Sequence, residues 1–282
     1  MSLIRLTAIL TVHNRKEKTI AALESLFSQI EIGESFAITV VLVDDGSSDG
    51  TSQAIETLFG PRVHVLSGDG SLFWARGMNL AERTAIVDRP DAVLWINDDI
   101  VLDDDAVARA VALYERSDHR TIIVGAMRSS TDGSTTYGGS RLRTSRPGSM
   151  VAVRPSTASI PIDTFNGNFV LVPKSVYSSV AAIRTVFSHA YGDIDYGLRA
   201  RSAGFGALLA PGQFGVCDFN PKTGTWQDQS LPRLQRIKTL FGRKGYPVRS
   251  HLAFNRAHGG ALWPIYFAGT YVKSLGKIAI GR

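Results

Sequence analysis

The feature of this sequence that most restricts its fold is an alternation between short apolar runs and helical patterns. The apolar runs, rich in β-branched residues, occupy 6–12, 38–43, 63–66, 92–96 and 122–126. Apolar residues with helical spacing occupy 20–27, 74–87 and 103–114. Runs that are apolar throughout and separated by helices are typical of a parallel sheet covered on both faces. The sequence therefore predicts an α/β, Rossmann-like fold with a mostly parallel central sheet flanked by helices.

The second half of the chain follows a different pattern. Residues 129–161 are rich in Gly, Ser, Thr and Arg, and predict a hairpin or a flexible loop near the ligand site. A turn that feeds a buried strand is expected over 165–172, a helix over 193–203, and a short apolar run over 208–210. After Pro232 the pattern is helical to the end. We predict two parts, a domain of residues 1–221 and a helical C-terminal extension of residues 222–282.

Charge is distributed unevenly between these two parts. The extension holds 11 Lys/Arg and a single acidic residue, Asp228, for a net charge of +10, whereas residues 1–221 carry −4. Such a tail is expected to meet an anionic partner, and aromatic residues among its cations favour a membrane surface over nucleic acid or free phosphate. A solvated helical face or a homodimer interface is the alternative. We expect no nucleic-acid partner.

The single cysteine and the absence of long apolar runs suggest a cellular location. Cys217 has no second cysteine with which to pair, which favours a reducing compartment. No apolar run approaches the roughly 20 residues of a membrane-spanning helix, and the first residues lack a signal-peptide pattern. We expect a cytoplasmic protein.

Polar clusters follow three of the predicted strands, at the carboxyl ends where open α/β sheets bind ligands. Their members are Thr11, Asn14 and Arg15 after the first run, Asp44 and Asp45 after the second, and Asp98 and Asp99 after the fourth. The glycine-rich fingerprint of dinucleotide-binding enzymes is missing after the first run, which argues against a nicotinamide dehydrogenase.

The acidic residues in these clusters admit a functional and a purely structural interpretation. Asp98 and Asp99 would repel each other unless a divalent cation lies between them and a phosphate, although an acidic turn is an equal alternative. Asp45 stands where an acidic residue commonly binds a ribose or a base, although turn chemistry also explains it. Asp193 and Asp195 lie at a predicted helix start, where the helix dipole favours carboxylates and a general base is the functional alternative.

Taken together and in this order, the clusters resemble the inverting glycosyltransferases of the GT-A fold known as family 2. The matching stretches are LTVHNR at 10–15, VDDGSSDGT at 43–51, WINDD at 95–99, FNGN at 165–168 and GDIDYGLRA at 192–200. The resemblance covers about residues 4–220. The stretches GDGSLFW at 68–74 and GMN at 77–79 are similar to bacterial rhamnosyltransferases of surface-polysaccharide synthesis.

The resemblance implies inverting, metal-dependent transfer of a sugar from a nucleotide-sugar donor to a hydroxyl of a glycan or lipid-linked glycan, with Mg²⁺ or Mn²⁺ as cofactor. A lipid-linked acceptor would bring the enzyme to the inner face of the cytoplasmic membrane as a peripheral protein. The site residues follow by class. They are Thr11, Asn14, Arg15, Asp44, Asp45 and Asp98 for the nucleotide, Asp99 and Asp98 for the metal, Asp193 for the base, and Trp74, Asn166 and Asn168 for the sugar or acceptor.

The sequence departs from the family pattern at two places. Gly192 stands where the family has glutamate, so that Asp195 is a rival of Asp193 for the role of base. Cys217 and Asp218 stand where many relatives have a metal-binding histidine, so that Asp218 is either an oxygen ligand or part of a structural loop. These departures keep open a catalytically inactive scaffold or binding subunit. A nucleotidyltransferase is a further alternative, but residues 11–15 are not its glycine-rich loop.

Overall fold

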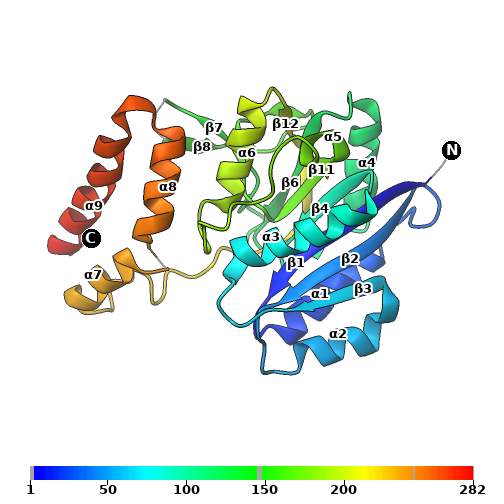
Figure 1. Cartoon of the computed structure of the whole chain (residues 1–282), viewed down its shortest axis with the longest axis horizontal. Helices are drawn as coiled ribbons and strands as arrows, with labels where there is room; N and C mark the ends of the chain where they lie inside the picture. The colour runs from blue at the N-terminus through cyan, green and yellow to red at the C-terminus, as the bar shows by residue number, and fades with distance from the viewer. Residues whose placement is uncertain (1–2, 145–147, 244, 282) are drawn as a thin grey trace.

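A computed structural model describes residues 3–144, 148–243 and 245–281. Residues 145–147, within the predicted hairpin segment, and residues 244 and 282 of the extension lie outside the described residues. The described part of the chain forms a twisted central sheet covered by helices, with a group of three helices at one end (Figure 1).

The first half of the chain builds four parallel strands. These are β1 (Ile4–Val12), β2 (Phe36–Asp44), β3 (Val63–Ser67) and β4 (Ala92–Ile96), arranged in the order β3-β2-β1-β4. Val12 of β1 is in register with Asp44 of β2. The residues that follow the two strands therefore emerge side by side at one edge of the sheet.

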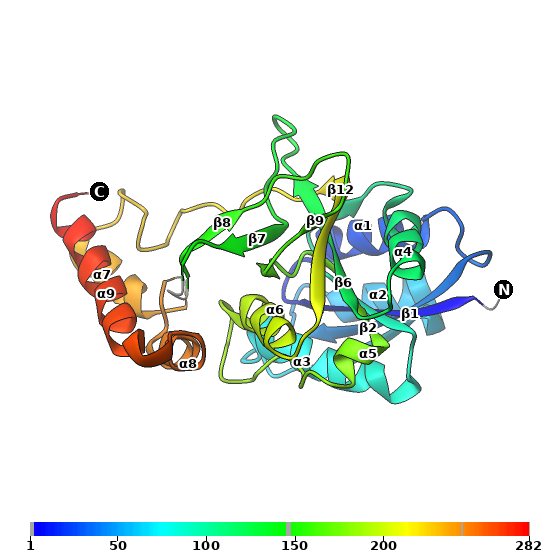
Figure 2. The same ribbon diagram turned by 90° about the horizontal axis from the view of Figure 1, so that it is seen from above.

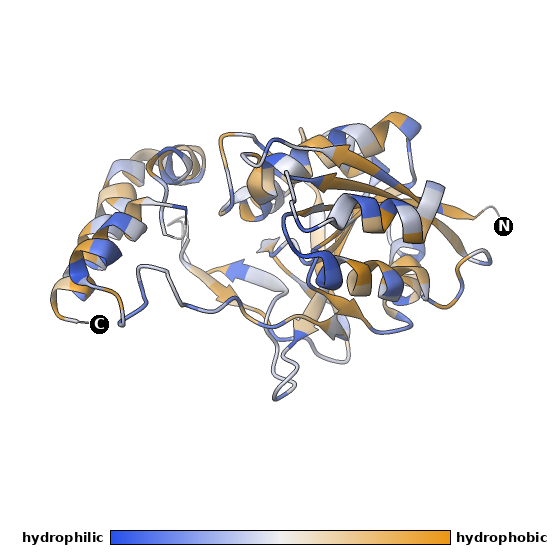
Figure 3. Ribbon diagram, turned by 90° about the horizontal axis from the view of Figure 1, so that it is seen from below, coloured by the Kyte–Doolittle hydropathy of each residue, from blue (hydrophilic) through white to orange (hydrophobic). Residues whose placement is uncertain are grey.

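Helices connect the strands and cover both faces of the sheet. They are α1 (Lys16–Phe27), α2 (Thr51–Phe59), α3 (Phe73–Ala85), α4 (Ala106–Arg116), α5 (Lys174–Tyr177) and α6 (Gly192–Ser202). Side chains from α1, α2 and α4 pack into one hydrophobic core, and those from α3, α5 and α6 pack into a second core on the opposite face. Leu10 belongs to the first core and its neighbour Ile9 to the second, which explains why the strands are apolar throughout (Figure 3).

The predicted α/β sheet is confirmed, but its second half is mixed rather than parallel. Strand β11 (Phe169–Pro173) lies between β4 and β6 (Thr121–Arg128) and is antiparallel to both. Strand β12 (Gly206–Val216) is parallel to β6, and the short strands β5 (Val101–Leu102) and β9 (Ile160–Pro161) pair antiparallel with it. Helix α4 begins three residues later than expected, because Asp103 instead pairs with Arg128.

The predicted hairpin segment supplies two of the three described strands of a second, small sheet, and the third follows it in the chain. The strands of this sheet are β7 (Gly139–Leu142), β8 (Met150–Ala152) and β10 (Thr164–Phe165), in the order β10-β7-β8. The β7–β8 hairpin points away from the central sheet toward the C-terminal helices (Figure 2).

The chain after β12 folds into α7 (Arg233–Phe241), α8 (Val248–His258) and α9 (Trp263–Ala279). These helices have a small core of their own around Trp226, Leu240 and Tyr271, whereas Phe254 of α8 joins the core of the main domain. Within the described residues, no helix combines the length and the apolar character needed to cross a bilayer.

Candidate active site

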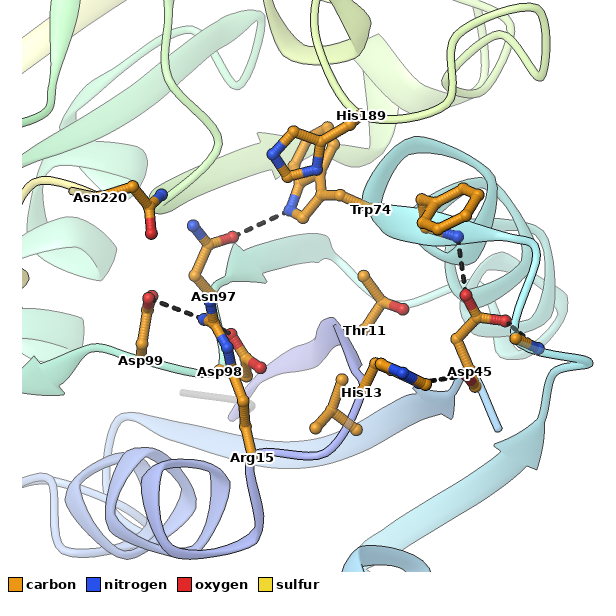
Figure 4. Close-up of a pocket in the computed structure, with 13 residues that line it drawn as sticks. Thr11, His13, Arg15, Asp45, Trp74, Asn97, Asp98, Asp99, His189 and Asn220 are labelled. Carbon is orange, nitrogen blue, oxygen red and sulfur yellow. Dashed lines mark hydrogen bonds and ion pairs between the residues drawn. The ribbon is translucent and has the colours of Figure 1, made fainter. Parts of the chain in front are cut away.

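A cleft opens at the carboxyl ends of β1, β2 and β4, as expected for an open α/β sheet. One part of this cleft is a cavity of about 230 Å³ (Figure 4). The predicted nucleotide and metal residues that line it are Thr11, Arg15, Asp45, Asp98 and Asp99, together with Trp74. These residues are far apart in the sequence and meet because parallel strands end at the same edge.

Asp45 fixes one wall of this cavity. Its carboxylate accepts hydrogen bonds from the backbone N–H groups of Gly70 (2.9 Å), Leu72 (3.2 Å) and Phe73 (2.8 Å). Phe73 has a positive φ of 54°, which non-glycine residues seldom adopt. Arg243 from the extension covers the Phe73 ring, with its guanidinium carbon 4.1 Å from the ring centroid. Asp45 thus holds the 70–73 loop in a shape that the chain would not favour by itself.

Two predicted nucleotide residues lie outside the cavity lining and build the adjoining turn. Asp44 accepts a hydrogen bond from the Ser47 N–H group at 2.9 Å and another from the Ser52 hydroxyl. The Asn14 side chain accepts one from the Ser48 N–H group at 2.7 Å. Both residues therefore satisfy local backbone donors.

Asp98 and Asp99 lie side by side, and one cation contacts both. A guanidinium nitrogen of Arg15 is 3.1 Å from an Asp98 oxygen and 2.9 Å from an Asp99 oxygen. Burial raises the pKa of Asp98 to about 6, with Asp99 adding repulsion and Arg15 opposing the rise. The Arg15 charge thus offsets a repulsion that is costly at a partly buried site.

The carboxylate pair has the donor chemistry expected of a magnesium or manganese site. No cluster of three or more His, Cys, Asp or Glu side chains suited to a metal is found in the described residues. Mg²⁺ usually keeps several waters and binds through one or two carboxylates plus substrate phosphates. Two adjacent carboxylates at an open cleft therefore fit a metal that arrives with a diphosphate.

A second cavity of about 130 Å³ adjoins the first and shares several of its residues. The predicted acceptor and base residues Asn166, Asn168 and Asp193 line it, and Trp74 and Asp99 border both cavities. The Trp74 indole N–H group donates to the Asn97 side-chain oxygen at 2.9 Å (Figure 4), and both residues line both cavities.

Asp193 faces this second cavity from the first turn of α6. Its carboxylate accepts hydrogen bonds from the backbone N–H groups of Gly167 at 3.0 Å and Ile194 at 2.8 Å. Burial raises its pKa, and these two hydrogen bonds oppose the rise. Among the described residues no cation forms a salt bridge with it. The carboxylate is therefore held in place while keeping the capacity to take a proton.

Asp195 lies outside the residues that line either cavity. It is fully buried, and its carboxylate forms salt bridges with Arg184 and Arg199 and a hydrogen bond with His258 Nε2. Burial alone would raise its pKa, but these hydrogen bonds outweigh burial and lower the pKa to about 2. The structure thus places the two carboxylates of this motif in opposite environments.

Cys217 is buried beside the acidic pair, with its sulfur 3.6 Å from an Asp99 oxygen. Burial, followed by the charge of Asp99, raises the pKa of the thiol to about 12. The side-chain amide of Asn168 donates to the same sulfur at 3.3 Å. Asp218 is exposed and accepts hydrogen bonds from the N–H group and the hydroxyl of Ser130, at 2.8 and 2.6 Å.

Sequence reasoning overlooked several residues that line the cleft. His13, Asn97, His189 and Asn220 contribute to it, and His189 lies over Trp74 in Figure 4. Burial lowers the pKa of His189. The histidines show no ligand spacing in the sequence. Only His13 and Asn97 could have been identified as site residues from the sequence, because they belong to the polar clusters that follow β1 and β4.

A sheet of this topology, with a carboxylate pair and a separate partly buried carboxylate at one cleft, defines an enzyme of the GT-A glycosyltransferase class. A model of the family described as "Glycosyl transferase family 2" matches residues 7–170. The chain belongs to this family and is a glycosyltransferase. No curated protein matches the chain.

Solved structures with similar folds include three glycosyltransferases of low sequence identity. The mannosyltransferase PcManGT from Pyrobaculum calidifontis, in complex with GDP-Man and Mn²⁺, is 19% identical, with a TM-score of 0.59 over 99% of this chain and 74% of that one. TarS from S. aureus is 13% identical, with a TM-score of 0.59 over 99% and 92%. GalNAc-T7 with UDP, GalNAc and Mn²⁺ is 12% identical, with a TM-score of 0.62 over 92% of this chain and 52% of that one.

Proposed function

We propose that the protein transfers a sugar, with inversion, from a nucleotide-sugar donor to a hydroxyl of a glycan or lipid-linked glycan in cell-surface polysaccharide synthesis. The observation that carries this proposal is the division of the cleft. The Asp98–Asp99 pair borders one cavity, Asp193 borders the next, and Trp74 and Asp99 belong to both. The GDP-Man and UDP complexes of the structural neighbours support a nucleotide-bearing donor.

The donor would bind in the cavity lined by Thr11, Asp45 and the acidic pair. Asp98 and Asp99 would hold a divalent cation on the donor diphosphate, where it would neutralise the charge that develops as this group leaves. Mn²⁺ in two neighbouring structures supports such a cofactor. Arg15 contacts both carboxylates, at the place where the cation would bind. We propose that the cation replaces Arg15 there when the donor binds, and that Arg15 then contacts the diphosphate.

Asp193 is the proposed general base. The acceptor oxygen forms a bond to the anomeric carbon while the bond from that carbon to the diphosphate oxygen breaks. The bonding electron pair leaves with the diphosphate, and Asp193 takes the proton of the acceptor hydroxyl. A carboxylate whose pKa is raised by burial is closer to the operating pH and accepts this proton more readily. A single displacement from the opposite face inverts the anomeric centre.

A screen of nucleoside diphosphates and nucleotide sugars, with Mn²⁺ or with EDTA, tests the donor site. The screen should include an NDP-rhamnose, because residues 68–79 resemble rhamnosyltransferases and we propose this donor class first. Ligand at about 100 times its dissociation constant adds roughly 2.7 kcal/mol, or several degrees in Tm. We expect a metal-dependent rise that Asp99→Asn abolishes. A flat response from the folded protein would instead support a scaffold.

We also propose that the C-terminal extension docks on an anionic membrane surface. Ile265 and Val272 on one side of α9, and Ile280 just beyond its end, are 66%, 70% and 67% exposed. Lys273 and Lys277 border this apolar stripe, as in helices that lie in a lipid interface. Figure 3 shows apolar and polar residues interspersed along this helix.

Vesicle sedimentation tests the membrane proposal. The full chain should sediment with phosphatidylcholine vesicles that contain phosphatidylglycerol, and less with phosphatidylcholine alone. Ile265→Ser combined with Val272→Ser should release it, whereas Leu58→Ser, at an exposed apolar position of α2, should not. Equal partitioning of the paired variant would contradict the proposal. A concentration-dependent dimer that the same pair disrupts would assign the stripe to a second copy.

A further inference from the structure

A cavity of about 470 Å³ lies apart from the cleft, between residues 148–150 at the start of β8, the residue that precedes α6 and the C-terminal helices. In Figure 2 the hairpin points directly toward α8 and α9. Tyr191, Trp226 and Tyr246 contribute aromatic rings to its walls. None of the residues placed in the donor or base sites lines it.

One face of α9 supplies polar side chains to this cavity. Thr270, Lys273, Ser274 and Lys277 all line it, and their spacing places them on the same side of the helix. No Asp or Glu is among the described lining residues. Neither lysine forms a salt bridge with a carboxylate of the described chain. The described lining therefore carries two ammonium groups that have no carboxylate counter-ion among the described residues.

Tyr191 lines this cavity from the position just before α6. Its φ of 77° is in the left-handed region, which glycine adopts at a lower energetic cost than residues that carry a Cβ atom. The Tyr191 ring stacks on Phe254 with a centroid distance of 4.6 Å, and its hydroxyl is 2.9 Å from the His251 Nδ1 atom. An aromatic ring is thus kept at a position whose backbone favours glycine.

We propose that this cavity binds the phosphate-bearing end of the acceptor, a sugar phosphate ester, with the lysines on the phosphate and the rings beside the sugar. Two ammonium groups one helical turn apart match a phosphate that carries up to two negative charges, since lysine binds phosphate as a point charge. The proposal rests on the proposed function, because it names the class of acceptor for the same reaction.

The chain itself connects the cavity to the proposed base. Tyr191 lines the cavity and Asp193 lines the cleft, and residues two apart have Cα atoms at most about 7 Å from each other. An acceptor anchored by its phosphate therefore passes the first turn of α6 to present a hydroxyl to Asp193. The lysines also border the apolar stripe of α9, so a lipid-linked phosphate would enter from the membrane side.

Binding measurements on the full chain test this assignment. The probes are α-D-glucose 1-phosphate as the soluble source of the phosphate ester, farnesyl phosphate in neutral detergent as the lipid source, and methyl α-D-glucoside as a neutral control. EDTA and the Asp99→Asn background keep the donor site from contributing. Lys273→Gln with Lys277→Gln removes the cavity cations, and Lys238→Gln with Arg249→Gln removes equal charge from exposed positions of α7 and α8.

We expect at least one phosphate probe to bind, and the cavity pair to weaken it about tenfold or more while the control pair leaves it unchanged. The probe that binds more tightly identifies a soluble or a lipid-linked source. Quenching of Trp226 fluorescence, lost in Trp226→Phe, gives a second measurement that does not depend on the lysine variants.

Absence of binding by both phosphate probes, or equal weakening by both pairs, would overturn the assignment. Its failure is distinct from that of the proposed function. Metal-dependent nucleotide binding would persist if only the cavity assignment is wrong, and it would be absent if the donor site is wrong.

Discussion

The Nε2 atom of His258 lies 2.8 Å from an oxygen of Asp195, so α8 of the extension is joined to the helix that carries Asp193. Arg184 and Arg199 complete the contacts of this buried carboxylate. Asp195 therefore connects three segments of the chain, whereas Asp193 one half-turn away faces the cleft. The two carboxylates should respond very differently to substitution.

Asp193→Asn should lower kcat by about 100-fold or more, because a positioned general base contributes roughly 10²- to 10⁴-fold. Nucleotide binding and Tm should change little. Asp195→Asn should instead lower the free energy of unfolding by about 3 kcal/mol, since it removes the charge of a fully buried carboxylate that pairs with the partly exposed Arg184 and Arg199. Steady-state kinetics and thermal unfolding of both variants separate these outcomes. A catalytic loss in Asp195→Asn without a loss of stability would reverse our assignment of the base.

Arg15→Gln should tighten Mn²⁺ binding several-fold when no nucleotide is present. Arg15 contacts both carboxylates that would hold the metal, so its charge competes with the cation. The same variant should bind the nucleoside diphosphate more weakly, because it lacks the guanidinium that we place on the diphosphate. Calorimetric titration with Mn²⁺ alone, and then with nucleotide, measures both effects. Unchanged Mn²⁺ affinity would show that Arg15 does not compete with the metal.

Gly167→Ala should impair activity through Trp74. A Cβ atom at position 167 would lie 2.5 Å from the Trp74 ring, so the indole must move away from Asn97. We expect kcat/KM to fall by tenfold or more, because small displacements of positioning groups are costly. Gly269→Ala is the matched control, since its Cβ meets nothing within 4 Å and alanine favours a helix. Equal activity in both variants would argue against a role for the Trp74 position.

Glu82→Gln should change how stability depends on pH. Burial raises the pKa of Glu82 to about 7 from an ordinary value of 4.5. Between these values the unfolded chain loses the proton and the folded chain keeps it, so the wild type loses stability as pH rises from 4.5 to 7. Relative to the wild type, the free energy of unfolding of the variant should rise across this pH range, by up to about 3 kcal/mol. Urea unfolding at several pH values measures the gain, and exposed Glu56→Gln should show none.

Strands β1, β2 and β4 could be predicted because they are buried on both faces, and the half-buried edge strand β3 because its apolar run continues the same alternation with helices. Continuous apolar runs such as 92–96 exclude a surface strand, and the helical spacing between them requires parallel connections. The same logic placed Thr11, Asp45 and Asp99 at one edge. Strand β11 was predicted as a buried strand, but its antiparallel position between β4 and β6 was not, because pairing depends on contacts distant in sequence.

The amino-acid sequence by itself determined the α/β class and the polar clusters, since these follow from local patterns of apolar and acidic residues, and the resemblance of those clusters to family 2 indicated the family. The tertiary structure alone decided which of those residues share a cleft. In the folded chain, Asp44 and Asn14 accept hydrogen bonds from backbone N–H groups of the turn, and Asp195 is surrounded by cationic side chains. His189 lines the cavity proposed for the nucleotide-sugar, and Arg243 contacts Phe73 beside it. The physical reason is that burial and hydrogen-bond partners are set by segments far apart in the chain, and these determine whether a carboxylate takes up a proton or stabilises the fold.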